Sequence, residues 1–307
     1  MFLADKYSSL LPSHHYPATA SPKANRRQQQ QGKAARLDAA LAARLRGLLP
    51  LPASPLAALA RLADLLALTL GEAAPALAGE GDAVAVAAHL DAGVALLDAC
   101  NAITARLDRL RLRRLLARFA LHLLSSSPSS PSSIGRARAA LTDRAATSPP
   151  PPLPSLPFDQ PRGRLSAAAR VLVAVNSVSS LAAAAAASVL GGGALAAAFP
   201  LVSSDFPWAE AFNTVSIQLS TLATNTSEVD AIDEAVQKLA SVLDGEGGID
   251  EAALRAAAQE VEKRTEELTA RLDPLSDAVS RVFRAALCLR DAELGSFMVG
   301  PTEKTCK

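Results

Sequence analysis

Leucines recur along the N-terminal third of the chain at the spacing of one helical face. The first stripe consists of Leu37, Leu41, Leu45 and Leu48. These intervals of 4, 4 and 3 residues predict an amphipathic helix, which Pro50 ends because proline cannot continue a helix. Pro55 suits the first turn of a second helix, and Gly71 suits its C-terminal end. The leucines of this second helix are Leu56, Leu59, Leu62, Leu66 and Leu70.

A long helical segment begins near Asp82, a residue type that caps helix N-termini. Its first apolar set is Leu96, Cys100, Ile103, Leu107 and Leu110, and its second is Leu112, Leu115, Leu116, Phe119 and Leu123. At about 100° per residue, the two sets point well over about 90° apart. One straight helix cannot bury both sets against one neighbour. We therefore expect a kink, a break or a change of packing partner near residues 110–111.

The C-terminal half shows heptad-like stripes. They are Trp208, Phe212, Val215, Leu219 and Leu222; Val229, Ile232, Val236, Leu239 and Leu243; and Leu254, Ala258, Val261, Thr265, Leu268 and Leu272. Ser227, with Asp230 three residues on, is suited to capping the second of these helices. Pro274 restarts a last helix that carries Leu275 to Leu289. Spacings of 3 and 4 favour antiparallel packing at shallow angles, so we predict an all-α, multi-helix bundle of long antiparallel helices.

Composition divides the chain into five segments. Residues 1–36 are rich in Ser, Gln, Arg and Lys, which predicts a disordered tail. Residues 37–124 and 164–296 are predicted helical regions that pack together into one bundle, and residues 297–307 form a second tail. Residues 125–163 hold nine Pro and nine Ser, as in a linker. One short helix near residues 134–146 interrupts this linker.

Composition and charge then narrow the function. Half of the residues are apolar and 4% are aromatic, and the dominant Ala and Leu are strong helix formers. The 31 basic and 30 acidic residues nearly balance, so no large net positive charge favours binding to nucleic acid. Three widely spaced cysteines suit a reducing compartment, and we expect the cytoplasm. No secretory signal opens the chain, and a plastid transit peptide is the alternative reading of its first residues.

An uncharged run of 34 residues lies between Arg170 and Asp205. It is long enough to span a bilayer, but Ala, Ser and Asn176 make it a weak membrane segment. We therefore favour a buried central helix, which small residues would allow to pack closely. Membrane association through residues 171–202 stays open as the alternative.

Six arginines crowd one stretch of the long helix. They are Arg106, Arg109, Arg111, Arg113, Arg114 and Arg118. On a helix they fall into two stripes, and they would suit a phosphoinositide headgroup or an acidic partner protein. The alternative is a solvated face whose arginine stems cover the core. No aromatic residues interleave with them, so we expect no nucleic-acid binding.

Constellations that carry chemistry are absent from the sequence. His14, His15, His89 and His122 do not pair with Cys or carboxylates at ligand spacing. The glycines 191–193 are not followed by Lys and Ser or Thr, as a phosphate loop would be, and no Gly-x-Ser-x-Gly elbow occurs. We therefore predict a non-enzymatic protein without a catalytic, cofactor or metal site, for which no small-molecule substrate is identified, and which acts through protein partners.

Three blocks of the sequence resemble the plant BYPASS family. They are residues 96–122, residues 206–212 with the order Phe-Pro-Trp-Ala, and residues 283–291. The motif positions are Cys100, Asn101, Phe119, His122, Pro207, Trp208, Phe212, Arg290 and Asp291. We expect Trp208 and Phe212 to be buried structural anchors, and the family supplies no catalytic residues.

The resemblance implies a regulatory or adaptor protein in root and shoot development. Members of the family are linked to restraining a root-derived mobile signal that arrests shoot growth. A related branch is associated with the exocyst, which implies a membrane-associated trafficking factor as the alternative.

Overall fold

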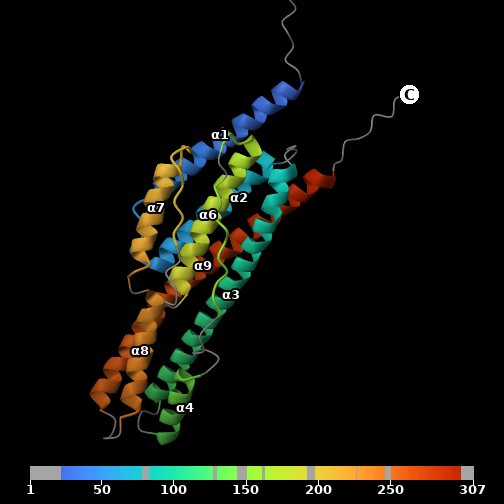
Figure 1. Ribbon diagram of the computed structural model, residues 1–307. Coiled ribbons are helices and arrows are strands. Elements are labelled where there is room, and N and C mark those ends of the chain that lie inside the picture. Colours follow the sequence, from blue (N-terminus) through green and yellow to red (C-terminus); the bar gives the residue numbers. More distant parts are fainter. Residues whose placement is uncertain are drawn as a thin grey trace, which may run out of the picture.

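Helices account for all the regular structure in the described part of the chain, which contains no strand. The computed structural model describes residues 22–77, 83–126, 130–143, 151–160, 163–191, 198–225, 227–245 and 250–298. The elements are α1 (Pro22–Leu48), α2 (Pro55–Leu77), α3 (Ala83–Ser126), α4 (Pro131–Leu141), α6 (Ala167–Leu190), α7 (Ala209–Leu222), α8 (Glu228–Leu243) and α9 (Glu251–Met298). The predicted all-α helical bundle is confirmed (Figure 1).

Two long helices run through the molecule and join its two ends. Helix α3 has 44 residues and α9 has 48, which corresponds to roughly 65–70 Å each at 1.5 Å per residue. They pack against each other and extend from the end that holds α1 and α2 to the end that holds α4 and α8 (Figure 1). The shorter helices cluster around these two.

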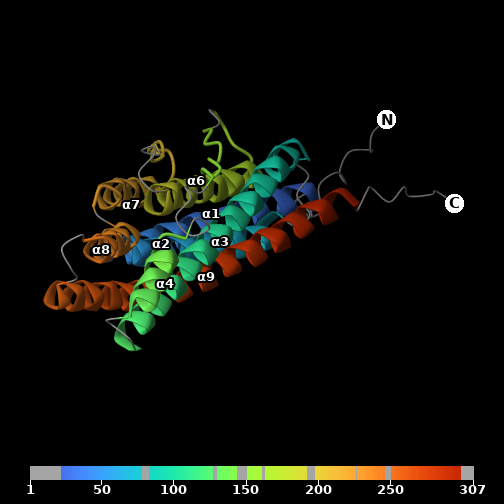
Figure 2. The same cartoon turned by 90° about the horizontal axis from the view of Figure 1, so that it is seen from below.

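The larger core surrounds α2. Helix α2 packs against α9 on one side and α6 on the other, while α1 contacts α2, α6 and α7. Figure 2 shows the resulting layers, with α6 and α7 on one side, α1 and α2 in the middle and α9 on the other side. We call this the proximal region: α1, α2, α6, α7, residues 83–110 of α3 and residues 268–298 of α9. Its side chains form one continuous apolar cluster.

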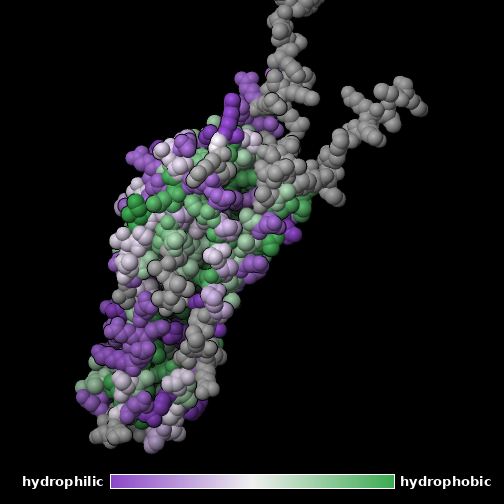
Figure 3. All heavy atoms as spheres, in the orientation of Figure 1, coloured by the Kyte–Doolittle hydropathy of each residue, from purple (hydrophilic) through white to green (hydrophobic). Residues whose placement is uncertain are grey.

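A smaller core lies at the other end of the long helices. Helices α3, α4, α8 and α9 each contribute to it, as in a four-helix bundle. We call this the distal region: residues 113–126 of α3, α4, residues 233–243 of α8 with Asp244 directly after it, and residues 251–261 of α9. Its buried side chains are Ala117, Ala120, Leu124, Ala137, Leu141, Ala235, Leu239, Leu243, Leu254, Ala257 and Val261. Hydrophilic residues gather on the surface over α8 (Figure 3).

Helix α1 begins earlier than the sequence analysis placed it. The predicted disordered tail extended to residue 36, but α1 starts at Pro22. Its Gln, Ala, Lys and Arg residues are good helix formers. The Ala34 side chain is buried, and Lys33 Nζ donates to the carbonyl of Pro75 at 3.0 Å. Residues 1–21 of the predicted tail lie outside the described residues.

Two expected helix ends are also wrong. Helix α2 passes Gly71 and continues through Pro75 to Leu77, and α9 continues through Pro274. An internal proline costs about 3 kcal/mol because one backbone hydrogen bond is lost. Fully burying one leucine gains about 1.5–3 kcal/mol, and Leu272 and Leu275 beside Pro274 are both fully buried. Packing on both sides of the proline therefore keeps the helix continuous.

The expected short helix inside the linker is present as α4, with Pro131 in its first turn. Residues 151–160 form no helix. Ser227 caps α8 as predicted, since its hydroxyl accepts from the Asp230 N–H and the Asp230 side chain accepts from the Ser227 N–H. Asp82 and residues 299–307 lie outside the described residues. The division into five segments stays a prediction.

Helix α6 contains most of the uncharged run and lies inside the bundle. Val175, Val178 and Leu181 are fully buried, and the Ser177 hydroxyl donates to the Val173 carbonyl at 2.7 Å. Of the described helices, α6 is the one long and apolar enough to cross a membrane, and 72% of its most apolar window is buried in the protein. Membrane association through residues 171–202 stays a prediction, and residues 192–197 lie outside the described part.

Helix α3 continues through residues 110–111, where we expected a kink, a break or a change of packing partner. Leu107 and Leu110 belong to the proximal core, whereas Ala117, Ala120 and Leu124 belong to the distal core. A change of packing partner therefore occurs, as one of the three alternatives foresaw. Two of the three residues that make the new contact are alanines, and of the expected set Leu123 packs against the distal core.

Candidate functional site

Three aromatic side chains anchor the segment that leads into α7. Trp208 and Phe212 are fully buried, as the resemblance led us to expect. The Trp208 ring stacks on Phe206 with centroids 5.0 Å apart and meets Phe212 edge to face at 5.7 Å. Such pairs add to the gain from burial. This cluster fixes the segment against α1 and α6.

A buried carboxylate links the aromatic cluster to two helices. Asp38 on α1 accepts from Trp208 Nε1 at 2.9 Å and from the Arg170 guanidinium on α6 at 2.5 Å. The Arg170 guanidinium also lies 6.0 Å from the Phe206 ring centroid. Both oxygens of this buried carboxylate therefore have donors, as a buried charge requires. The network holds α1, α6 and the segment before α7 in one arrangement.

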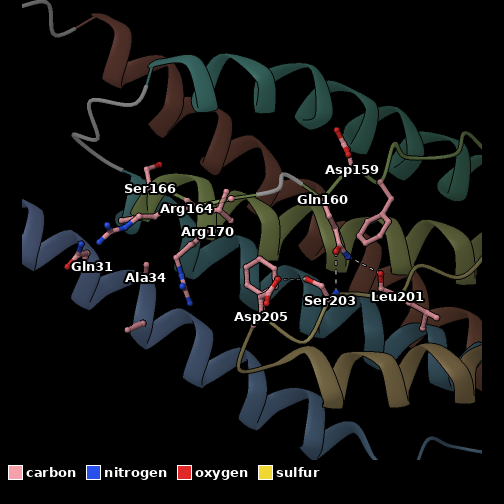
Figure 4. A pocket seen from close by; sticks show the side chains of 16 residues that line it. Gln31, Ala34, Asp159, Gln160, Arg164, Ser166, Arg170, Leu201, Ser203 and Asp205 are labelled. Carbon is pink, nitrogen blue, oxygen red and sulfur yellow. Dashed lines mark hydrogen bonds between the residues drawn. The ribbon is translucent and has the colours of Figure 1, made fainter.

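A cleft of about 1,080 Å³ opens beside this network. Figure 4 shows its wall formed by Gln31 and Ala34 of α1, by Arg164, Ser166 and Arg170 around the start of α6, and by the segments 158–160 and 201–206. Gln160 ties the two segments together, since it donates to the Leu201 carbonyl at 2.9 Å and accepts from the Ser203 N–H at 3.2 Å. Hydrogen bonds therefore hold together the two segments that form one wall of the cleft.

The chemistry that this cleft offers is binding by hydrogen bonds and charge. Its lining residues include neither His nor Cys, so the lining offers no imidazole base or thiol nucleophile. Arg164, Arg170, Asp159 and Asp205 all line it, which gives the lining both signs of charge. Among the described residues, no group of three His, Cys, Asp or Glu side chains is arranged to hold a metal ion.

The structure separates the six arginines of the predicted patch. Arg106 is buried, and its guanidinium donates to the Leu190 carbonyl at the end of α6 and to the Pro151 carbonyl at 2.6 Å. Burial, and to a smaller extent Arg109, lowers the pKa of Arg106. This arginine closes the C-terminal end of α6, where a cation interacts favourably with the helix dipole.

Three more of the arginines connect α3 to other helices. Arg113 forms an ion pair with Asp233 of α8, and Arg111 pairs with Asp108 at 3.0 Å and with Asp273 of α9 at 3.6 Å. Arg114 donates to the Thr269 hydroxyl at 3.3 Å. Arg118 is exposed beside a groove between α3 and α9. The predicted single anion patch is thus distributed around α3, and whether any part of it binds an anion stays a prediction.

One face of α3 is apolar and exposed. Leu112, Leu115 and Phe119 are 39%, 56% and 42% exposed, although the sequence analysis expected them to be buried. The Arg136 guanidinium of α4 lies 5.6 Å from the Phe119 ring centroid. These three side chains follow one another at intervals of 3 and 4 residues, so they form one stripe.

A buried polar pair joins α3 to α9 in the proximal region. His89 Nε2 and Glu293 Oε1 lie 3.5 Å apart, and both side chains are almost fully buried. Burial lowers the pKa of His89 to about 4, although a hydrogen bond with Asn176 acts in the opposite direction. Burial raises the pKa of Glu293 to about 7. The two groups are therefore both neutral over the pH range between these values.

One curated protein resembles this chain over most of its length. It is "Protein BPS1, chloroplastic" of Arabidopsis thaliana, which is 27% identical over 230 residues. The match covers 67% of this chain and 64% of the relative, so the chain spans less than two thirds of the relative's length. No known protein family matches in a scan of family profiles, and no solved structure matches. The chain is therefore similar to a BYPASS-family protein over these 230 residues.

The BYPASS motif positions are distributed over both regions. Cys100 is buried in the proximal core, and burial raises the pKa of its thiol to about 11. Trp208 and Phe212 are fully buried, Arg290 is half-buried, and the other five positions are exposed. These exposed positions are Asn101, Phe119, His122, Pro207 and Asp291. The motif therefore combines buried structural anchors with surface side chains.

Sequence reasoning missed the residues that complete the Trp208 network. The sequence analysis did not single out Asp38, which falls within the first predicted helix. It named Arg170 only as the residue that precedes the uncharged run. An aspartate between the buried Leu37 and Leu41 stripe positions was the available signal, since a charge close to a core face needs a partner. The partner, Trp208, is 170 residues away in sequence.

Proposed function

We propose that this chain is a non-enzymatic helical regulatory or adaptor protein in plant root and shoot development. The observation that carries the proposal is the 230-residue match with BPS1, which supports a role in plant developmental regulation. The geometry supports action by contact, because several polar residues of the cleft already hydrogen-bond to other protein groups: Gln160, Ser166, Arg170, Ser203 and Asp205. The exposed stripe on α3 offers a surface for a protein partner.

The finer proposal is that the protein restrains a root-derived mobile signal that arrests shoot growth. A knockout of the gene in its source plant should give short roots and an arrested shoot. Grafting separates the two organs: a wild-type shoot on a mutant root should arrest, while a mutant shoot on a wild-type root should grow. Normal growth of the first graft would contradict a mobile signal from the root.

A membrane-associated trafficking factor that contacts exocyst components is the second candidate function. The length and apolarity of α6 favour it. Carbonate extraction of membranes from expressing cells tests it, because integral proteins resist this treatment. Recovery of the whole protein in the supernatant would rule out insertion of α6, and co-precipitation of exocyst subunits tests the contact separately.

We propose a cytoplasmic location, with membrane association through α6 in the second candidate function. The relative is described as chloroplastic, which supports plastid import as the competing proposal. A fluorescent protein fused to the C-terminus of the full chain distinguishes them in leaf cells. Fluorescence inside chloroplasts, together with loss of N-terminal residues from the protein on a gel, would replace the cytoplasmic proposal.

A further inference from the structure

The exposed stripe on α3 has the spacing of a coiled-coil seam. Leu112, Leu115 and Phe119 occupy positions a, d and a of a heptad. Asp108 and His122 fall at the neighbouring d positions and limit the apolar section at both ends. The three side chains are among the large hydrophobic residues that the described chain leaves exposed. We call this section the 112–119 seam.

The seam is bordered by arginines on both sides. Arg111 and Arg118 occupy the two g positions beside the apolar section, and Arg109 occupies an e position. Arg136 of α4 approaches from the other side and covers one face of Phe119. Charges at e and g positions select the partner in a coiled coil, so these arginines favour acidic residues on the facing helix.

A second copy of this chain does not fit the seam. An antiparallel pair would bring Arg111 and Arg118 of one copy against the same g-position arginines of the other, and a parallel pair would bring Asp108 against Asp108 at its d position. Like charges across an interface disfavour pairing.

The chain's own segments outside the described residues do not fit either. Residues 1–21 and 299–307 contain one acidic residue each and residues 144–150 contain none. The other such segments, which include Glu80, Asp82 and Glu246, are each at most six residues long, too short to lie along the seam as a helix. The acidic helix must therefore come from another protein.

An anionic membrane surface is the other binder of basic amphipathic helices. Two carboxylates at the edge of the seam argue against it. Asp108 lies on the same face of α3, and Asp273 of α9 approaches Arg111 to 3.6 Å. These carboxylates would be repelled by anionic lipid, whereas a facing protein helix can place a basic or polar residue opposite them.

We propose that the 112–119 seam docks an acidic amphipathic helix of a partner protein, side by side with α3. Leu112, Leu115 and Phe119 pack between the apolar residues of that helix, and Arg111 and Arg118 pair with its carboxylates. This inference deepens the adaptor proposal and rests on it.

A designed helical peptide tests the seam without knowledge of the natural partner. The peptide has about four heptads with Leu at a and d and Glu at e and g, and a fluorescent label reports its binding to the full chain by anisotropy. A second peptide carries Lys in place of Glu. We expect the Glu peptide to bind at least tenfold more tightly than the Lys peptide, with a preference that weakens as salt rises.

Variants assign the binding to the seam. Leu115→Ala combined with Phe119→Ala should weaken binding of the Glu peptide at least tenfold. Arg118→Glu, which removes no ion pair described here, should reduce binding of the Glu peptide and increase binding of the Lys peptide. Ile217→Ala on α7 is the matched control, since Ile217 is 58% exposed and lies outside the seam. Circular dichroism confirms that each variant is folded.

Four results would overturn the proposal. They are absence of Glu-peptide binding, equal binding of both peptides, unchanged binding by the folded L115A/F119A variant, and loss of binding in the Ile217→Ala control. Sedimentation with phosphatidylserine vesicles provides a further arm. Vesicle binding that is lost in L115A/F119A, without Glu-peptide binding, would assign the seam to lipid. The developmental proposal is tested separately. Short roots and an arrested shoot in the knockout plant would support it even if the seam binds no acidic helix.

Discussion

The proximal and distal regions share two helices but bury different kinds of side chain. The proximal core contains Trp208, Phe212 and long rows of leucines, together with the buried Asp38. Five of the eleven buried residues in the distal core are alanines. Alanine buries far less apolar surface than leucine, so the distal helices come close together but gain less from each buried side chain.

The two ends are therefore expected to contribute differently to the stability of the protein. The proximal region carries most of the burial and two polar networks, which favours stability and one fixed arrangement. The distal region relies on the ion pairs that join α3 to α8 and α4 to α8, and surface ion pairs contribute little each. We therefore expect the distal end to open locally before the protein unfolds as a whole.

Replacing Trp208 should have the largest effect. Trp208→Ala should lower the free energy of unfolding by about 3–5 kcal/mol, because it leaves a large cavity and removes the N–H that Asp38 accepts. Urea unfolding followed by circular dichroism measures this. Trp208→Phe is the control and should cost less, since it keeps most of the ring packing. Equal stability of Trp208→Ala and the wild type would refute the anchor role.

The His89–Glu293 pair should make proximal stability insensitive to pH over a defined range. In the unfolded chain, the pKa values of His89 and Glu293 lie near their ordinary values of 6.5 and 4.5, whereas in the folded protein they are about 4 and about 7. Between pH 4.5 and 6.5 the pair therefore holds one proton in either state, so it contributes no slope. Above pH 6.5 the folded state alone keeps a proton on Glu293, and stability falls as pH rises toward 7.

Glu293→Gln should make the stability of the protein depend on pH between 4 and 6.5, where the wild-type pair contributes little dependence. With His89 alone, the unfolded state binds the extra proton below pH 6.5. Stability should then fall by about 2–3 kcal/mol as pH drops from 6.5 to 4. The difference between the wild-type and Glu293→Gln stability curves isolates the pair from other carboxylates. Parallel curves between pH 4.5 and 6.5 would show that the two groups are not both neutral.

Truncating the distal core should have a smaller and more local effect. Leu239 is fully buried among α3, α4 and α9, and Leu239→Ala should cost about 2 kcal/mol, at the lower end for such changes. Amide hydrogen exchange should accelerate in α4 and α8 and stay unchanged in α2 and α6. Equal acceleration at both ends would show that the regions unfold as one unit.

Breaking one distal ion pair should have the smallest effect. Arg113 and Asp233 join α3 to α8 with partly exposed side chains, and such pairs contribute about 0–1 kcal/mol. A double-mutant cycle with Arg113→Ala and Asp233→Ala measures their coupling by urea unfolding. Burial raises the pKa of Asp233 while Arg113 opposes it. A coupling well above this range would mean that the distal end depends on charge more than on its core.

Local patterns predicted the helices, and distant contacts decided the rest. The leucine stripes of α1 and α2 and the Ser227 cap were readable because each depends on residues within one or two turns. The continuity of α9 through Pro274 was not, since burial of Leu272 and Leu275 against other helices outweighs the proline. The cleft was also beyond prediction, because α1, the start of α6 and the segments 158–160 and 201–206 that line it are far apart in the sequence. The sequence analysis identified Leu112, Leu115 and Phe119 as members of an apolar set, but it expected them to be buried.

The pairing of α2 with α9 has a consequence for how the protein is made. Helix α2 has its most extensive contacts with α9, yet Glu251 follows Leu77 by 174 positions (251 − 77). At about 5–20 residues per second, a ribosome needs roughly 10–35 s to cover that distance. During this time the side of α2 that packs against α9 is uncovered, although α1 and α6 can already contact α2. Chaperone binding to the nascent chain is therefore expected to begin at α2 and to end once α9 has emerged.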